Sequence, residues 1–237
     1  MKILKGLLIG IVTVVVILVL VGGYFGFVPG VSAVFGSDKP KNLGVTTSAE
    51  SFKTGIAKIG IVRNDAAAAV SPTVTYQGFH AVNVSLTSEE ISSLFQDGPW
   101  KKTWQFSSIA DDFQVKINHD GTVEAAGLLN IKKLNGYLSA TGFSDVLPYT
   151  SKFNFLPNEV PFYLSGSGSI TNNKVTLNAT KAELGRISLP TDANVVQAVE
   201  NLVERRIAEI PGMYMASVNL DGGTLNYKGT YPSVIKF

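Results

Sequence analysis

A run of residues without charge near the N-terminus constrains this chain more than any other feature. Residues 6–28 contain no Asp, Glu, Lys or Arg, and most of them are Ile, Leu, Val or Gly. A helix needs about 20 apolar residues to cross a bilayer, so the run is long enough. Tyr24, Phe25 and Phe27 stand near its far end, where aromatic side chains suit the headgroup region. We therefore expect residues 1–35 to be a cytoplasmic tip followed by a transmembrane helix.

The basic residues around this run predict its orientation. Lys2, Lys5 and the α-amino group precede it, whereas Asp38, Lys39 and Lys41 follow it with a smaller net charge. The side with more positive charge stays in the cytoplasm. We expect a single-pass protein of the plasma membrane, with its N-terminus cytoplasmic and its C-terminal domain extracytoplasmic.

A cleavable signal peptide is the main alternative. Val31, Ser32 and Ala33 are residues that a signal peptidase accepts, and cleavage after Ala33 would make the protein secreted. The apolar stretch is longer than the roughly 7–15 residues typical of a signal peptide, which favours the uncleaved anchor. A buried core helix is a third interpretation.

Composition excludes several classes of function. The chain has 20 basic and 18 acidic residues among 237, and loss of Lys2 and Lys5 with the first 37 residues leaves 18 of each sign. A neutral domain is not a nucleic-acid binder held by bulk positive charge. The absence of Cys excludes disulfides, thiol catalysis, zinc–thiolate sites and a lipidated-cysteine anchor.

Beyond the anchor, residues 36–51 are polar without a hydrophobic period and predict a tether, followed by a domain over 52–237. Residues 81–86 alternate as a half-buried strand does. Thr87 and Glu90 have the spacing of a capping box, which predicts that a helix begins there.

The remaining pattern is mostly strands and turns. Alternation predicts strands over 113–117, 122–129, 160–170, 175–179, 214–220 and 224–231, with a further strand near 136–140. An amphipathic helix is expected from Asp192 to Glu209, with Val199 in the core and Glu200 and Glu204 on the opposite face. The fold class is therefore α+β: an antiparallel sheet packed on two amphipathic helices. Both halves follow the order strand, helix, hairpin, so two similar halves are an alternative to one domain.

Catalytic and metal-binding motifs are not found. His80 and His119 are far apart in sequence, and the chain has no zinc-binding His pair, nucleophile elbow or phosphate loop. An enzyme would require Asp111, Asp112 and Glu124 to converge in one cleft. We expect a non-catalytic protein without cofactor or metal.

An aromatic stretch is the best candidate for a binding surface. Its members are Phe143, Tyr149, Phe153, Phe155, Phe162 and Tyr163. Apolar strands facing an apolar helix could leave an internal groove for a lipid or another apolar ligand. The same residues could instead contact an envelope protein, as in a structural or interaction module, or simply fill a core.

Three short stretches resemble those of a known group. Residues 86–91, Leu-Thr-Ser-Glu-Glu-Ile, and the C-terminal stretches 217–222 and 229–232 are similar to those of membrane-anchored exported bacterial proteins with a TULIP-like, or tubular lipid-binding, domain. The resemblance implies a long sheet wrapped around a helix and a lipid-facing or envelope role. It assigns no functional residue.

Overall fold

The computed structural model describes residues 2–28, 30–64, 75–96, 109–140, 147–150 and 157–236. Its helices are α1 (Lys2–Tyr24), α2 (Val31–Phe35), α3 (Ala49–Ile59), α4 (Ser88–Gln96), α6 (Ile131–Ala140), α7 (Leu147–Thr150) and α8 (Ala193–Glu209). Its strands are β1 (Val62–Asn64), β2 (Thr75–Thr87), β3 (Ala110–Ile117), β4 (Val123–Asn130), β5 (Glu159–Thr171), β6 (Lys174–Leu184), β7 (Ile187–Ser188), β8 (Tyr214–Asp221) and β9 (Thr224–Lys236).

The nine described strands form one sheet in the order β1-β9-β8-β5-β4-β3, with β2 added to β9, β6 to β5 and β7 to β6. The pairing of β1 with β9 is parallel, and the other described pairs are antiparallel. The expected α+β class with a mostly antiparallel sheet is confirmed.

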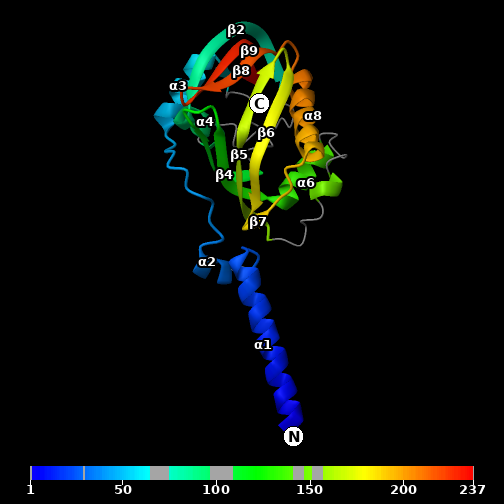
Figure 1. Ribbon diagram of the computed structural model, residues 1–237. Helices are drawn as coiled ribbons and strands as arrows, with labels where there is room; N and C mark the ends of the chain where they lie inside the picture. Colours follow the sequence, from blue (N-terminus) through cyan, green and yellow to red (C-terminus); the bar gives the residue numbers. More distant parts are fainter. Residues whose placement is uncertain are drawn as a thin grey trace.

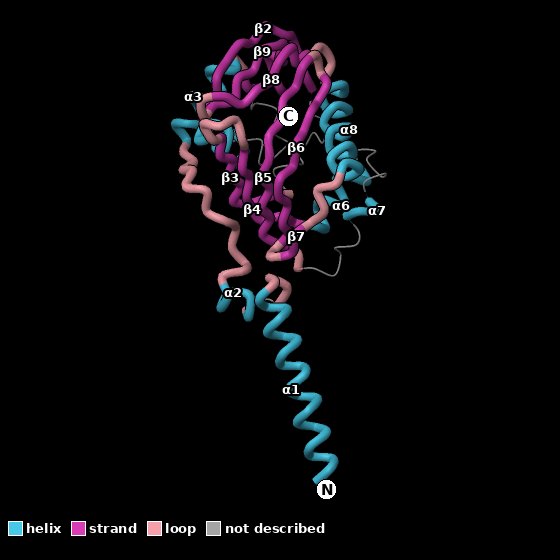
Figure 2. The backbone as a smooth tube through the Cα atoms, in the orientation of Figure 1, coloured by secondary structure: helices cyan, strands magenta, loops and turns pink. Residues whose placement is uncertain are grey.

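Strand β5 is where the sheet branches. One edge of β5 pairs with β6, while the other pairs first with β4 and then, at Ile170 and Thr171, with β8. In the described part of the chain, β2, β3 and β6 consequently form the long outer edges. Helices α3 and α4 lie on one side of the domain and α8 runs beside β6 (Figures 1 and 2).

Local sequence signals explain several boundaries. The Thr87 Oγ1 accepts from the backbone N–H of Glu90 at 3.2 Å, and Glu90 Oε2 accepts from the N–H of Thr87 at 2.9 Å. This reciprocal pair is the predicted capping box, and it starts α4. The turn between β3 and β4 places Gly121 at φ +80°, a conformation that costs glycine little.

Two helices differ from the sequence interpretation. The strand expected near 136–140 is wrong, because these residues belong to α6. Helix α3 was not predicted, although Ser48 caps its first turn by accepting from the N–H of Ser51, and Gly60 ends it at φ +77°.

The described core is divided into three small clusters rather than one. Their buried residues are Ile61 and Ile235; Ile131, Val160 and Leu184; and Leu86, Ile91 and Ile117. On α8, Ile207 is buried, but Val199 is 44% exposed. The expectation that Val199 lies in the core is therefore wrong.

Helix α1 extends away from the domain, from the end where α2 and β7 lie (Figure 1). Its side chains are described from Val12 onward. Within the described residues, no helix meets the length and hydropathy that crossing a membrane requires.

Candidate functional site

Apolar side chains surround the described part of α1. Val12 is 53% exposed, Leu18 64% and Tyr24 48%, and the valines and leucines between them have similar exposures. Exposure on every side of a helix is unusual for aliphatic residues in water, because a helix of a soluble domain normally buries one apolar stripe. The described surface of α1 is therefore mostly apolar and exposed.

A compact joint fixes the end of α1 to the domain. The Arg186 guanidinium lies 4.4 Å from the ring centre of Tyr24, and its Nη2 donates to the carbonyl oxygen of Phe35 at 2.7 Å. Phe27 packs against the core cluster of Ile131, Val160 and Leu184. A Cβ at Gly185 would lie 2.4 Å from the oxygen of Phe25, so the two backbones are in close contact.

The segment expected as a tether lies along the sheet. The N–H of Leu43 donates to Gln114 Oε1 at 3.0 Å, and Leu43 is buried. Further along, the N–H of Ser48 donates to the buried Ser93 Oγ at 2.9 Å. These contacts hold residues 43–48 against β3 and α4.

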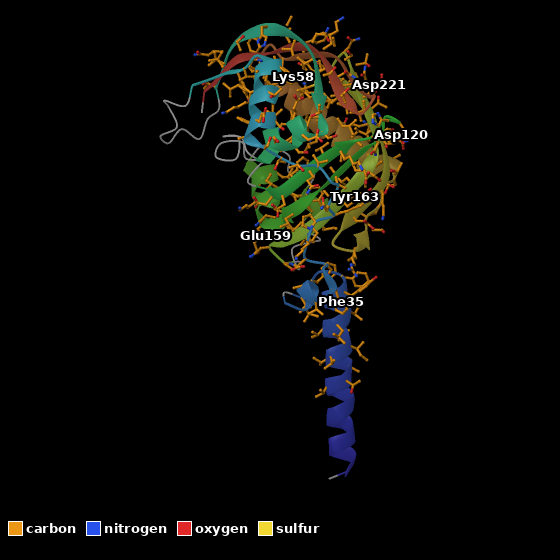
Figure 3. All side chains as sticks on the ribbon, turned by 90° about the vertical axis from the view of Figure 1, so that its left-hand side faces the viewer. Phe35, Lys58, Asp120, Glu159, Tyr163 and Asp221 are labelled. Carbon is orange, nitrogen blue, oxygen red and sulfur yellow. The ribbon has the colours of Figure 1, made fainter. Side chains whose placement is uncertain are left out.

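An ion pair on the same face holds this segment at a second point. Lys41 Nζ lies 3.1 Å from Glu124 Oε2, and it also stands 3.8 Å above the ring centre of Tyr163. The Tyr163 hydroxyl donates to Glu124 Oε2 at 2.6 Å. The hydrogen bond from Tyr163, assisted by Lys41 and Asn118, lowers the pKa of Glu124 below its usual value of 4.5. Figure 3 shows Tyr163 on this face of the sheet.

A surface cavity of about 460 Å³ opens between the segment and β3. It is lined by Asp38, Lys39, Pro40, Asn42, Val45, Thr47, Asp112, Gln114 and Leu128. Asp112 has φ +49° within an irregular part of the β3–β4 pairing, and an aspartate adopts this conformation more readily than most residues. The lining can form hydrogen bonds to a small polar molecule.

Two sheet edges are covered by helix side chains. On α4, Ser88 Oγ accepts from the N–H of Ile117 at 2.9 Å and Ser92 Oγ from that of Val115 at 2.8 Å. Four helix residues rise about 6 Å and two strand residues about 6.7 Å, so side chains at i and i+4 match alternate N–H groups of a strand. Helix α4 thereby occupies the outer edge of β3.

Helix α8 covers β6 in the same way. Glu200 Oε1 accepts from the N–H of Leu177 at 2.8 Å, and Glu204 Oε1 accepts from that of Val175 at 3.0 Å. Lys174 pairs with Glu204 and, with the N–H of Val175, lowers the pKa of that carboxyl. The expectation that these glutamates lie on the face away from the sheet is wrong. They attach α8 to the strand edge.

Apolar side chains on β5 and on α8 remain exposed. Leu164 on β5 is 46% exposed, between Ala125 of β4 and Ala182 of β6 in the register of the sheet. Val199 on α8 is exposed to a similar extent. The small neighbours of Leu164 leave its side chain accessible to an apolar molecule.

The structure separates the two described members of the aromatic candidate set. Phe162 packs in the core cluster of Val160 and stacks on Phe113 at 6.0 Å, whereas Tyr163 points to the opposite face, as successive residues of a strand do. The other candidates Phe143, Phe153 and Phe155, and the side chain of Tyr149, lie outside the described residues.

The carboxylates and histidines considered as catalytic candidates do not meet in one cleft among the described residues. Asp112 lines the cavity, whereas Glu124 is bound by Tyr163 and Lys41. The ring nitrogens of His80 contact the carbonyl oxygen of Ile59 at 2.8 Å and Ser233 Oγ at 3.1 Å. Among the described residues, no three His, Asp or Glu side chains are arranged to hold a metal ion.

The joint between α1 and the β6–β7 turn is the feature that sequence reasoning missed. Gly185 and Arg186 carry no recognisable motif, and their role depends on contacts with residues about 150 positions earlier. The sequence also did not predict that helix side chains cover two edges of the sheet. No protein-family model, curated protein or solved structure matches the chain, so the TULIP-like resemblance stays a prediction.

Proposed function

We propose that the chain is a single-pass membrane protein whose extracytoplasmic α+β domain works by binding rather than by catalysis. The observation that carries this proposal is the exposed aliphatic surface of α1 over residues 12–24. This surface lies within the uncharged run of residues 6–28, which is longer than the part of α1 whose side chains the structure describes. Each Val or Leu side chain moved from water into an apolar phase contributes about 1.5–3 kcal/mol. A helix also satisfies its own backbone hydrogen bonds, as a bilayer demands.

Membrane insertion is tested by fractionation of cells that express the full chain. The protein should stay with the membranes after an alkaline carbonate wash. Val16→Arg and Leu18→Arg together place two charges in the apolar run, and each costs about 2.5–3.5 kcal/mol at the centre of an inserted helix. This double variant should move to the soluble fraction. Recovery of the wild-type chain in the soluble fraction would contradict the proposal.

Orientation is tested with single cysteines, because the chain has none of its own. Val62→Cys, at a position 63% exposed on β1, should react with a membrane-impermeant maleimide added to intact cells. Lys2→Cys should react only after the cells are opened. The reverse pattern would place the domain in the cytoplasm.

For the ligand, we propose a lipid or another apolar molecule that contacts Leu164 on β5. Support comes from the exposure of this side chain and from a core divided into small clusters in the described residues. A fluorescent fatty acid should bind the full chain in detergent-free nanodiscs above the background of empty discs. Leu164→Asp should weaken that binding, and Val62→Asp, also at an exposed valine, should not. Equal binding by both variants would remove Leu164 from the ligand site.

A structural or protein-interaction module is the second candidate, and strand β2 favours it. Residues 75–83 contain no Asp, Glu, Lys or Arg, and most of their side chains are exposed. Such an edge can accept an extended segment of another protein as an added strand. Ala81→Lys should then abolish capture of an envelope protein by the full chain, with Val199→Lys as the control.

A further inference from the structure

Helix α2 has the reverse of the polarity expected for a surface turn in water. Val34 is 82% exposed and Phe35 37%, whereas Ser32 and Ser37 are 1% and 4% exposed. Buried polar groups and exposed apolar ones are the informative exceptions to the usual distribution. The short helix therefore presents its apolar side outward.

The buried serines explain how the turn is held in this orientation. Ser32 Oγ donates to the carbonyl oxygen of Val28 at 2.8 Å, and Ser37 Oγ donates to that of Gly23 at 2.6 Å. The N–H of Ser37 donates to the oxygen of Ser32, which closes the end of α2. With its polar groups satisfied internally, α2 keeps Val34 and Phe35 directed away from the domain.

The exposed side chains of α2 continue the apolar surface of α1. The ring centres of Tyr24 and Phe35 are 6.0 Å apart in an edge-to-face arrangement. Figure 3 places Phe35 where α1 meets the domain. Arg186 adds a cation beside this aromatic pair, through its contacts with the Tyr24 ring and the Phe35 carbonyl oxygen. An apolar surface bordered by tyrosine and arginine is typical of elements at the headgroup level of a bilayer.

We propose that α2 binds the lipid surface itself. Val34 and Phe35 enter the boundary between headgroups and acyl chains, and the Arg186 guanidinium pairs with lipid phosphate. This inference rests on the proposed membrane insertion of α1 and adds a second contact with the same leaflet. The domain is then seated on the bilayer by the end that carries α2 and the β6–β7 turn, rather than suspended above it.

The test measures the depth of single labelled positions in the full chain. Val34→Cys carries an environment-sensitive fluorophore in nanodiscs of phosphatidylcholine and phosphatidylglycerol, with and without nitroxide-labelled lipid. Val14→Cys, 56% exposed on α1, reports insertion of the anchor. Val62→Cys, 63% exposed, is the water-exposed control. It lies on β1 beside β9, and Figure 1 shows β9 at the end of the domain farthest from α1.

We expect nitroxide lipid to quench the labels at positions 14 and 34 several-fold more than the label at 62. Quenching at 14 without quenching at 34 would overturn the role of α2 and leave membrane insertion intact. Absence of quenching at 14 would overturn both. Because Val34 is 82% exposed, its substitution should leave the fold unchanged. In a second experiment the label is placed at Phe35→Cys, and Val34→Asp should reduce its quenching by nitroxide lipid.

Arginine 186 is tested in the same nanodiscs. Arg186→Gln should reduce quenching at position 34 and remove its dependence on the fraction of phosphatidylglycerol, whereas Arg186→Lys should retain part of that dependence. If quenching at 34 is insensitive to anionic lipid in the wild-type chain, Arg186 does not bind phosphate and that part of the proposal is wrong.

Discussion

The hydroxyl of Ser92 bonds both backbone groups of Val115: it accepts from the N–H at 2.8 Å and donates to the carbonyl oxygen at 3.2 Å. A residue of a neighbouring antiparallel strand would make the same two hydrogen bonds. Ser92 is fully buried, so one side chain of α4 replaces a strand at the outer edge of β3.

Loss of this hydroxyl should destabilise the domain. Ser92→Ala leaves the N–H of Val115 without this acceptor, which costs about 1–3 kcal/mol. Urea unfolding measures the change, and Ser139→Ala on the exposed face of α6 is the control, expected within about 0.5 kcal/mol of wild type. Equal midpoints for the two variants would show that α4 is not needed at this edge.

At the edge of β6, substitutions of Glu200 distinguish the role of its hydrogen-bond acceptor from the role of its charge. Glu200→Gln keeps an oxygen for the N–H of Leu177 and should unfold close to wild type, whereas Glu200→Ala should lose about 1 kcal/mol. Chemical denaturation of the three proteins distinguishes the cases. If Gln is as damaging as Ala, the carboxylate acts through charge and not through the hydrogen bond.

The same substitution should lower stability strongly at one position of α8 and very little at another. Ile207→Asp places a charge where the side chain is 4% exposed, and it should cost several kcal/mol, about the cost of an unpaired buried charge. Val199→Asp at 44% exposure should leave the thermal midpoint almost unchanged. A large loss at Val199 together with a small loss at Ile207 would reverse the assignment of the buried face.

Gly185 is expected to control the joint between α1 and the domain. Gly185→Ala would bring a methyl group within 2.4 Å of the Phe25 oxygen, in addition to the penalty of about 1–2 kcal/mol for alanine at positive φ. Gly222→Ala has the same penalty at φ +57° but meets no atom within 4 Å. The distance distribution between spin labels at Leu20→Cys and Val62→Cys should broaden only with Gly185→Ala. Broadening by both variants would trace the effect to backbone strain alone.

The Tyr163–Glu124 hydrogen bond predicts a pH dependence. A carboxyl whose pKa is lower in the folded chain adds stability above its unfolded pKa, and this stability is lost as the pH falls through the folded value. Tyr163→Phe should therefore be less stable than wild type at neutral pH, by less than about 1 kcal/mol for so exposed a pair, and equal to it at pH well below 4.5. Unfolding curves at several pH values measure this difference. A gap that is constant with pH would assign the loss to packing.

The sequence predicted those elements whose signals are local. The Thr87–Glu90 capping box and the glycine turn at Gly121 specify their own boundaries, because the interacting residues lie within three positions of one another. Helix α3 also has such a signal in Ser48 and Gly60, but the expected tether extends to residue 51 and therefore includes the first turn of this helix.

Features that depend on distant partners could not be predicted in this way. The glutamates of α8 form an ordinary polar face in sequence, and only the position of β6 shows that this face is the one that contacts the sheet. The same holds for Arg186, whose partners Tyr24 and Phe35 are far away along the chain. Amphipathic periodicity identifies two faces of a helix, but their contacts depend on the surrounding fold.

The close contact of Gly185 with Phe25 also has a mechanical consequence. With its end clamped by the β6–β7 turn, α1 is an arm about 35 Å long that turns together with the sheet. A change in the tilt of α1 would swing β2, at the far end of the domain, through an arc (Figure 1). In the opposite direction, a pull on β2 would reach α1 as torque. If α1 is inserted in a bilayer as proposed above, the protein would transmit force between that bilayer and a partner bound to β2.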